Sequence, residues 1–130
     1  MTIRLSKLDK DHIDIAGLHN NIASVFEAEE RYFEALLDYK KALRIYLKHH
    51  GSRHPRVAMV IVNLGNVYQL QGRYELSLQL YEKALQIYTG QLEDCHPNVS
   101  LVYTKIAFVY YQQSNQLMDD EPSMKGRRAW

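Results

Sequence analysis

The sequence predicts an all-α chain, an α-solenoid of antiparallel helix pairs with about two full repeats and the first helix of a third. The chain is internally duplicated: a shift of 42 residues superimposes His12, His54 and His96, and 13 of the 42 positions in residues 12–53 and 54–95 are identical. Apolar residues recur at the i, i+3, i+4, i+7 spacing of a helix face. Gly and Pro are scarce, at 6 and 3 residues, which favours helices over many short strands.

Composition limits the class of protein. A chain of 130 residues suffices for one ordinary domain, and 46% hydrophobic residues is near the globular average. The formal net charge of +1 lacks the basic excess of a duplex-binding surface, so no nucleic-acid partner is expected. The single cysteine, Cys95, excludes an internal disulfide and suits a reducing compartment. Because no apolar run has the length of a signal peptide or membrane span, we expect a cytoplasmic protein without a membrane partner.

The first unit, residues 12–53, is expected to hold one helix (helix A) at about 14–28 and a second (helix B) at about 32–49. A turn near residues 29–31 separates them. Two residues depart from the second unit. Glu30 stands where the second unit has Gly72, which predicts a less tightly closed turn. His19 replaces the apolar Ile61, which predicts looser pairing of the first two helices.

The second unit, residues 54–95, shows the pattern most clearly. Ile61, Leu64 and Tyr68 keep the spacing of one helix face, and the stretch "QGR" interrupts it with Gly72, a residue suited to end a helix. Helix B then runs from Tyr74. Because the turn is short, the two helices are expected to be antiparallel.

The two ends of the chain depart from complete repeats. Residues 1–11 align with the end of a helix B, so we interpret the chain as a segment of a longer array. A partial repeat, residues 96–113, supplies a third helix A at about 98–113. No second amphipathic helix follows Tyr111, and residues 114–130 are expected to form a disordered tail because they are polar and interrupted by Pro122 and Gly126.

Tyrosines recur every seven residues in both units, at positions 32, 39 and 46 and again at 74, 81 and 88. A coiled coil would need its apolar heptads sustained over about three or four repeats, and a catalytic array would need recurring acids and bases. We therefore expect the rings to pack between helix B of one unit and helix A of the next, opposite small residues such as Ala42, Gly65 and Ala84.

These features resemble the tetratricopeptide repeat. Its large and small packing positions are matched by Ile61, Leu64, Gly65, Tyr68, Tyr74, Tyr81 and Ala84. The 42-residue period, with "HPRVA", "NLGNVY" and "GRYELSLQLYEKALQIY", is similar to the longer variant found in kinesin light chains, and the resemblance covers residues 12–113. It implies a non-catalytic scaffold module that binds an extended peptide segment of a partner on a concave surface formed by the helices A.

The candidate peptide-binding residues lie on helix A. Asn21 and Asn63 share one repeat position, where the third unit has Lys105. An Asn amide offers both a donor and an acceptor to a peptide backbone, and Asn is a poor choice for a helix interior, so its repetition suggests a use. The resemblance implies that this position contacts the peptide, with further contacts from Ser24, Asn66, Gln69 and Phe108 and shallow apolar pockets near Met59, Leu70, Leu101 and Phe108. The alternative is an exposed repeat position without a role.

Two other polar clusters are candidate sites. His12, His54 and His96 are separated by helix layers of about 8–10 Å each, too far apart to share one metal ion, so we expect them to cap the turns between units. A basic cluster is either a solvated face or a site for an acidic partner; it comprises Lys40, Lys41, Arg44, Lys48, His49, His50, Arg53 and Arg56. No nucleophile–base pair or phosphate loop is evident, and Cys95 beside His96 is not by itself a dyad, so neither enzymatic activity nor a cofactor is expected.

A second function remains open at the sequence level. The apolar stretch "VYTKIAFVYY", residues 102–111, lacks a following helix B to cover it. Large exposed apolar faces mark association surfaces. The chain is therefore alternatively a structural spacer or an oligomerisation element that self-associates through residues 102–111.

Overall fold

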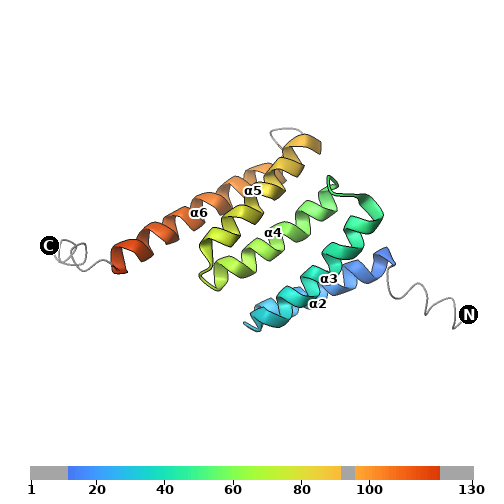
Figure 1. Cartoon of the computed structure of the whole chain (residues 1–130), viewed down its shortest axis with the longest axis horizontal. Coiled ribbons are helices and arrows are strands. Elements are labelled where there is room, and N and C mark those ends of the chain that lie inside the picture. The colour runs from blue at the N-terminus through green and yellow to red at the C-terminus, as the bar shows by residue number, and fades with distance from the viewer. Residues whose placement is uncertain (1–11, 92–95, 121–130) are drawn as a thin grey trace, which may run out of the picture.

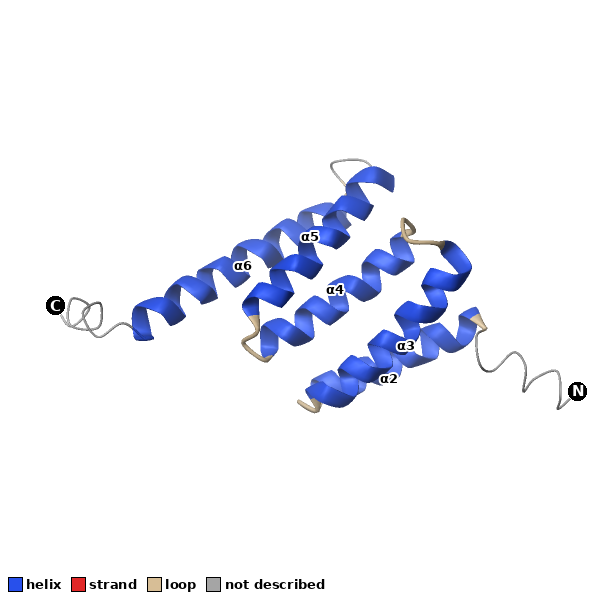
Figure 2. Cartoon of the chain, in the orientation of Figure 1, coloured by secondary structure: helices blue, strands red, loops and turns tan. Residues whose placement is uncertain are grey.

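A computed structural model describes residues 12–91 and 96–120, with side chains through residue 117. These residues form five helices and no strand (Figures 1 and 2). The helices are α2 (Ile13–Ala28), α3 (Tyr32–His50), α4 (Pro55–Leu70), α5 (Tyr74–Gln91) and α6 (Pro97–Asp120). Within the units, helix α2 packs against α3, and α4 packs against α5. Between the units, α3 packs against α4, and α5 packs against α6. The all-α solenoid of adjacent helix pairs is confirmed.

Helix α6 ends later than the sequence suggested. It runs to Asp120, so residues 114–120, expected to belong to a tail, continue the helix of the partial repeat. The polar stretch after Tyr111 is compatible with a helix because Gln, Leu and Met are good helix formers. Residues 1–11, the expected end of a preceding helix B, and residues 121–130 lie outside the described residues.

Each helix A begins at a histidine. His12 Nδ1 accepts a hydrogen bond from the Asp14 backbone N–H at 3.1 Å. The same bond joins His54 to the N–H of residue 56 at 3.0 Å, and His96 to the N–H of residue 98 at 3.1 Å. The first turn of a helix has backbone N–H groups without an intrahelical acceptor, so each ring supplies one. The prediction that these histidines cap the units is confirmed.

The two turns within the helix pairs are alike. Glu30 has a φ of 62° and Gly72 a φ of 77°, both in the left-handed region. In each turn the next residue donates its backbone N–H to a carbonyl five residues earlier, from Arg31 to Phe26 and from Arg73 to Tyr68, both at 2.8 Å. The expectation that Glu30 loosens the first turn was therefore wrong: the backbone closes identically, and Glu30 adopts a conformation that favours glycine.

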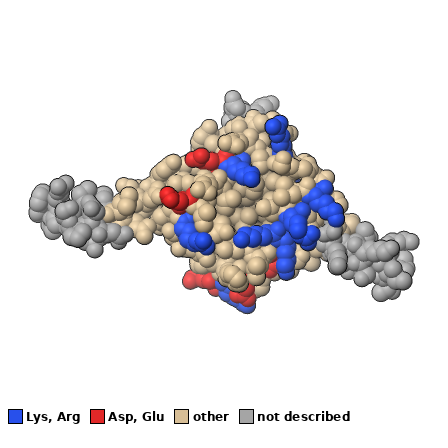
Figure 3. All heavy atoms as spheres, viewed as in Figure 1, with Lys and Arg blue, Asp and Glu red and all other residues tan. Residues whose placement is uncertain are grey.

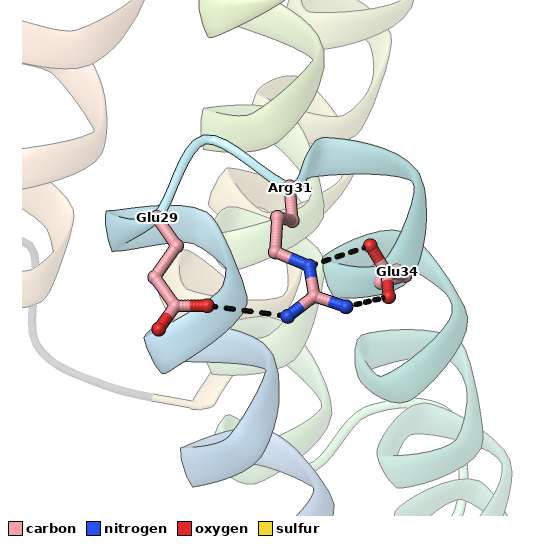
Figure 4. Close-up of polar contacts among 3 residues, drawn as sticks. All are labelled: Glu29, Arg31 and Glu34. Carbon is pink, nitrogen blue, oxygen red and sulfur yellow. Dashed lines mark hydrogen bonds and ion pairs between the residues drawn. The ribbon is translucent and has the colours of Figure 1, made fainter.

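Arg31 joins the two helices across the first turn. Its guanidinium forms two hydrogen bonds to the Glu34 carboxylate and reaches Glu29 Oε1 at 3.5 Å (Figure 4). It also lies over the Phe26 ring at 4.7 Å, and Arg73 repeats this contact on Tyr68 at 5.0 Å. All three charged side chains are about half exposed, so the cluster orients the turn and contributes little to stability.

Four of the repeated tyrosines are buried as expected, but two of them pack against a different helix from the one predicted. Tyr39, Tyr46, Tyr81 and Tyr88 are buried. A Cβ placed on Gly65 would lie 2.7 Å from the Tyr81 ring, so Tyr81 of α5 seats against α4 of its own unit. The Tyr81 hydroxyl donates to Asn66 Oδ1 at 2.5 Å, and Tyr39 donates to Glu27 Oε1 at 2.8 Å. These two rings thus join the helices within a unit, not between units as expected, whereas Tyr88 of α5 lines the space next to α6 of the following unit.

Candidate functional site

The first helices of the three units, α2, α4 and α6, lie side by side and form what we call the helix A surface. Hydrogen bonds between side chains join them in sequence. Asn63 Nδ2 donates to Asn20 Oδ1 at 3.0 Å, linking α4 to α2. Gln69 Nε2 donates to Gln112 Oε1 at 2.7 Å, linking α4 to α6. The amides that mark this surface in the sequence therefore hold neighbouring units in register.

A groove of about 500 Å³ opens on this surface between α4 and α6. Apolar side chains form much of it, including Met59 and Leu101, whose apolar character was predicted to matter here. Polar groups border them. The groove is lined by Pro55, Arg56, Met59, Val62, Asn63, Asn66, Tyr88, Asn98, Leu101, Val102 and Lys105. A mostly apolar concavity with a few polar groups is the usual form of a ligand site.

The structure places the predicted site residues in two groups. Asn63, Asn66 and Lys105 line the groove together. The other four, Asn21, Ser24, Gln69 and Phe108, lie outside its lining, with Asn21 and Ser24 exposed on α2 and Phe108 half exposed on α6. The groove therefore contains Asn63 and Lys105 but not Asn21, so it does not hold the continuous row of three residues. The peptide-binding role of all seven residues stays a prediction.

Sequence reasoning did not assign six of the lining residues to this site, namely Pro55, Arg56, Val62, Tyr88, Asn98 and Val102. Arg56 and Asn98 occupy one repeat position, two residues after the capping histidines, so the internal alignment contained a signal for both. Tyr88 belongs to α5 and reaches the groove from the second helix of its unit. No sequence pattern distinguishes that position from the other buried tyrosines.

The polar groups of the groove favour an anionic or backbone ligand. Arg56 and Lys105 supply two cations, and no Asp or Glu is among the lining residues. Asn66 uses its carbonyl oxygen to accept from Tyr81, which directs the donor half of the amide to other partners. Burial raises the pKa of Tyr81 to about 12, so its hydroxyl stays protonated near neutral pH and acts as a donor. Tyr81 thus contributes to the site by orienting the Asn66 side chain.

The described part of the chain offers neither a metal site nor a membrane span. Within residues 12–91 and 96–120, no group of three or more His, Cys, Asp or Glu residues is arranged to hold a metal ion. None of the helices there combines the length and apolarity that crossing a membrane requires.

Stacked helix pairs with capped, duplicated turns define the class of α-helical repeat proteins. A model of the tetratricopeptide repeat matches residues 14–89 and again residues 56–117, and the chain belongs to this family. Repeats of this family generally mediate protein–protein interaction. Comparison with curated protein sequences finds no match.

The fold is also found among solved structures. The chain is similar to BtubC (BKLC) from P. vanneervenii, whose crystal structure superposes with a TM-score of 0.74. The match covers 96% of this chain and 49% of that one, at 23% sequence identity. This chain therefore spans about half the length of that protein, and the similarity concerns the fold.

Proposed function

We propose that this chain is a non-catalytic interaction module that binds an extended peptide segment of a partner protein in the groove between α4 and α6. The observation that carries the proposal is the composition of the groove, which has a volume of about 500 Å³. Its lining combines apolar side chains with two cations and three asparagine amides. Such a site can pair with backbone amides and bury alternate side chains of an extended peptide. Lys105 and Arg56 suit an acidic side chain or a terminal carboxylate.

The test is a screen of a displayed peptide library against the whole chain, followed by affinity measurements on a selected peptide. Lys105→Gln and Arg56→Gln are expected to weaken binding about tenfold each, the loss typical of a hydrogen bond to a charged group. Asn21→Ala tests whether the peptide extends beyond the groove, because Asn21 shares the repeat position of Asn63 and Lys105 but lies outside the groove lining. Equal affinity of wild type and both groove variants would contradict the proposal.

The alternative function, a spacer or oligomerisation element, rests on α6. Tyr103 and Tyr110 occupy the repeat positions of Ile61 and Tyr68 on α4, where α5 packs. Ile61 is 4% exposed, whereas Tyr103 is 56% and Tyr110 52% exposed in the described structure. An apolar face of this kind supports self-association through residues 102–111.

Sedimentation velocity over a range of concentrations tests this alternative. Self-association predicts a sedimentation coefficient that rises with concentration in the wild type and stays constant in a Tyr103→Gln, Tyr110→Gln variant. A monomer at all concentrations would remove the alternative and leave the peptide-binding proposal unaffected.

A further inference from the structure

A cationic row runs along α3, on a different surface from the groove. Residues 39–74 contain seven Lys and Arg and no Asp or Glu, although the formal net charge of the whole chain is +1. Four of these cations are exposed on α3, and Figure 3 shows Lys and Arg atoms gathered over that helix. Because a helix rises 1.5 Å per residue, side chains four positions apart recur about every 6 Å along one side. We call Lys40, Lys41, Arg44 and Lys48 the α3 basic row.

The acidic residues of α3 have other partners. The Glu34 carboxylate binds the Arg31 guanidinium (Figure 4). Asp38 Oδ1 lies 3.0 Å from His19 Nδ1 of α2. Both acids precede the α3 basic row in the helix. Like charges three or four positions apart destabilise a helix by a few tenths of a kcal/mol, so helix stability does not account for the row.

The other complete unit shows that the repeat does not require the row. The repeat positions of Lys40, Lys41, Arg44 and Lys48 are occupied on α5 by Glu82, Lys83, Gln86 and Gly90. All four of these residues are exposed as well. The packing of the fold is therefore satisfied by one acid, one base and two uncharged residues, and the concentration of positive charge is particular to α3.

Neighbouring groups extend the cationic surface. Arg53, in the loop that follows α3, and Lys83 of α5 both line a hollow of about 530 Å³, together with Ser52 and Gln86. Leu37 and Leu47, beside the α3 basic row, are 47% and 39% exposed. The surface thus combines a line of charges with small apolar contacts and a concavity.

We propose that the α3 basic row binds an acidic segment of a partner protein in extended form. Side chains on one face of an extended strand recur about every 6.6–6.8 Å, close to the step of about 6 Å along the row, so alternate Asp or Glu residues meet successive cations. Charge complementarity of this kind speeds association and sets register.

Two other anionic partners fit less well. Binding of a single-stranded nucleic acid relies on aromatic platforms, and the strongly exposed aromatic residue of α3 is Phe33, seven residues or about 10 Å before Lys40. A membrane surface favours inserted apolar side chains, whereas more than half of the Leu37 and Leu47 surfaces is already covered by protein. The experiment therefore also measures binding to a single-stranded nucleic acid and to a membrane surface.

The experiment measures binding of a labelled peptide of alternating Glu and Ala to the whole chain by fluorescence anisotropy at low and high salt. The wild type is expected to bind at low salt and to weaken as salt rises. Changing the whole row (Lys40→Gln, Lys41→Gln, Arg44→Gln, Lys48→Gln) is expected to reduce affinity about tenfold or more, since exposed ion pairs are weak singly and these four act together. Arg73→Gln is the matched control and is expected to bind like the wild type, because Arg73 is an exposed cation outside the α3 basic row, the hollow and the groove.

Circular dichroism confirms that the variants are folded, and a Lys40→Gln, Lys41→Gln pair replaces the full set if it is not. A peptide of alternating Gln and Ala is expected not to bind. Equal binding of the wild type and the row variant overturns the proposal, as does weaker binding of the Glu peptide than of phosphatidylserine vesicles or an oligothymidine.

Discussion

His19 Nδ1 of α2 lies 3.0 Å from Asp38 Oδ1 of α3, and these two residues occupy the repeat positions of Ile61 and Leu80 in the next unit. One unit thus joins its helices by a partly buried polar pair where the other uses two apolar side chains. The side chains of His19 and Asp38 are 24% and 15% exposed. The expectation that His19 loosens the first helix pair did not consider Asp38, which provides its partner.

The polar pair predicts strong coupling between the two positions. His19→Ile alone is expected to cost about 1–3 kcal/mol, because it leaves the Asp38 carboxylate largely buried without this partner. The double variant His19→Ile, Asp38→Leu copies the second unit and is expected to recover most of that loss. Urea unfolding of the two single variants and the double variant gives the coupling energy. Additive effects would show that the contact has no energetic role.

Glu30 predicts a stabilising substitution. Its φ of 62° lies in the left-handed region, where a residue with a Cβ pays about 1 kcal/mol relative to glycine. Glu30→Gly is expected to raise the free energy of unfolding by about 0.5–1 kcal/mol, less any loss from increased freedom of the unfolded chain. Gly72→Ala, at the equivalent position with a φ of 77°, is the reciprocal control and is expected to lower the free energy of unfolding. Urea denaturation measures both, and a destabilised Glu30→Gly would refute the backbone argument.

Two glycines predict effects of opposite sign for the same substitution. A Cβ at Gly65 would lie 2.7 Å from the Tyr81 ring, so Gly65→Ala is expected to cost about 1–3 kcal/mol through overpacking. At Gly90, on α5, a Cβ meets nothing within 4 Å. Gly90→Ala is therefore expected to stabilise by up to about 1 kcal/mol through helix propensity. Thermal unfolding of the two variants checks the sign, and equal shifts would contradict the close contact.

The histidine caps predict that an acceptor matters at the start of each helix A. His54→Ala removes the bond from Nδ1 to the Arg56 backbone N–H and is expected to cost about 1 kcal/mol. His54→Asn retains a side-chain oxygen acceptor and is expected to recover much of that loss. The free energy of unfolding in urea distinguishes the two. If Asn is no better than Ala, the ring contributes through its stacking on His50 instead.

His50 predicts a pH dependence. Its ring stacks on His54 with centroids 4.0 Å apart, and its Nε2 is buried without a hydrogen-bond partner in the described structure. Burial, and then the positive charges of His54, Arg56 and His49, lower the pKa of His50 from its ordinary value of 6.5. As the pH falls, His50 therefore binds a proton in the unfolded chain before it does so in the folded chain. The contribution of neutral His50 to the free energy of unfolding is complete above about pH 6.5 and is lost below it.

The measurement is the urea midpoint near neutral pH and at about pH 5. The wild type is expected to lose stability on acidification, and His50→Gln is expected to lose less, because it removes one group that titrates differently in the two states. The remaining histidines are common to both proteins and cancel in the comparison. An identical loss in wild type and variant would exclude His50 as a contributor.

The sequence by itself determined the helices and their pairing. The 42-residue duplication, the apolar spacing and the recurring histidines define each helix A and B to within a few residues, because capping and amphipathic periodicity act over one or two turns of chain. The same locality explains the error at α6. Its polar continuation to Asp120 carries no apolar pattern by which a sequence could mark it as helix.

Only the tertiary structure decided which equivalent residues meet. Asn21 and Asn63 are the same residue at the same repeat position, yet Asn63 lines a groove with Lys105 while Asn21 is exposed outside that lining. Tyr81 turns to its own α4 because Gly65 leaves room for the ring. Contacts between units depend on how side chains of different volume fill one space, and that is a property of two packed surfaces that no single stretch of chain contains.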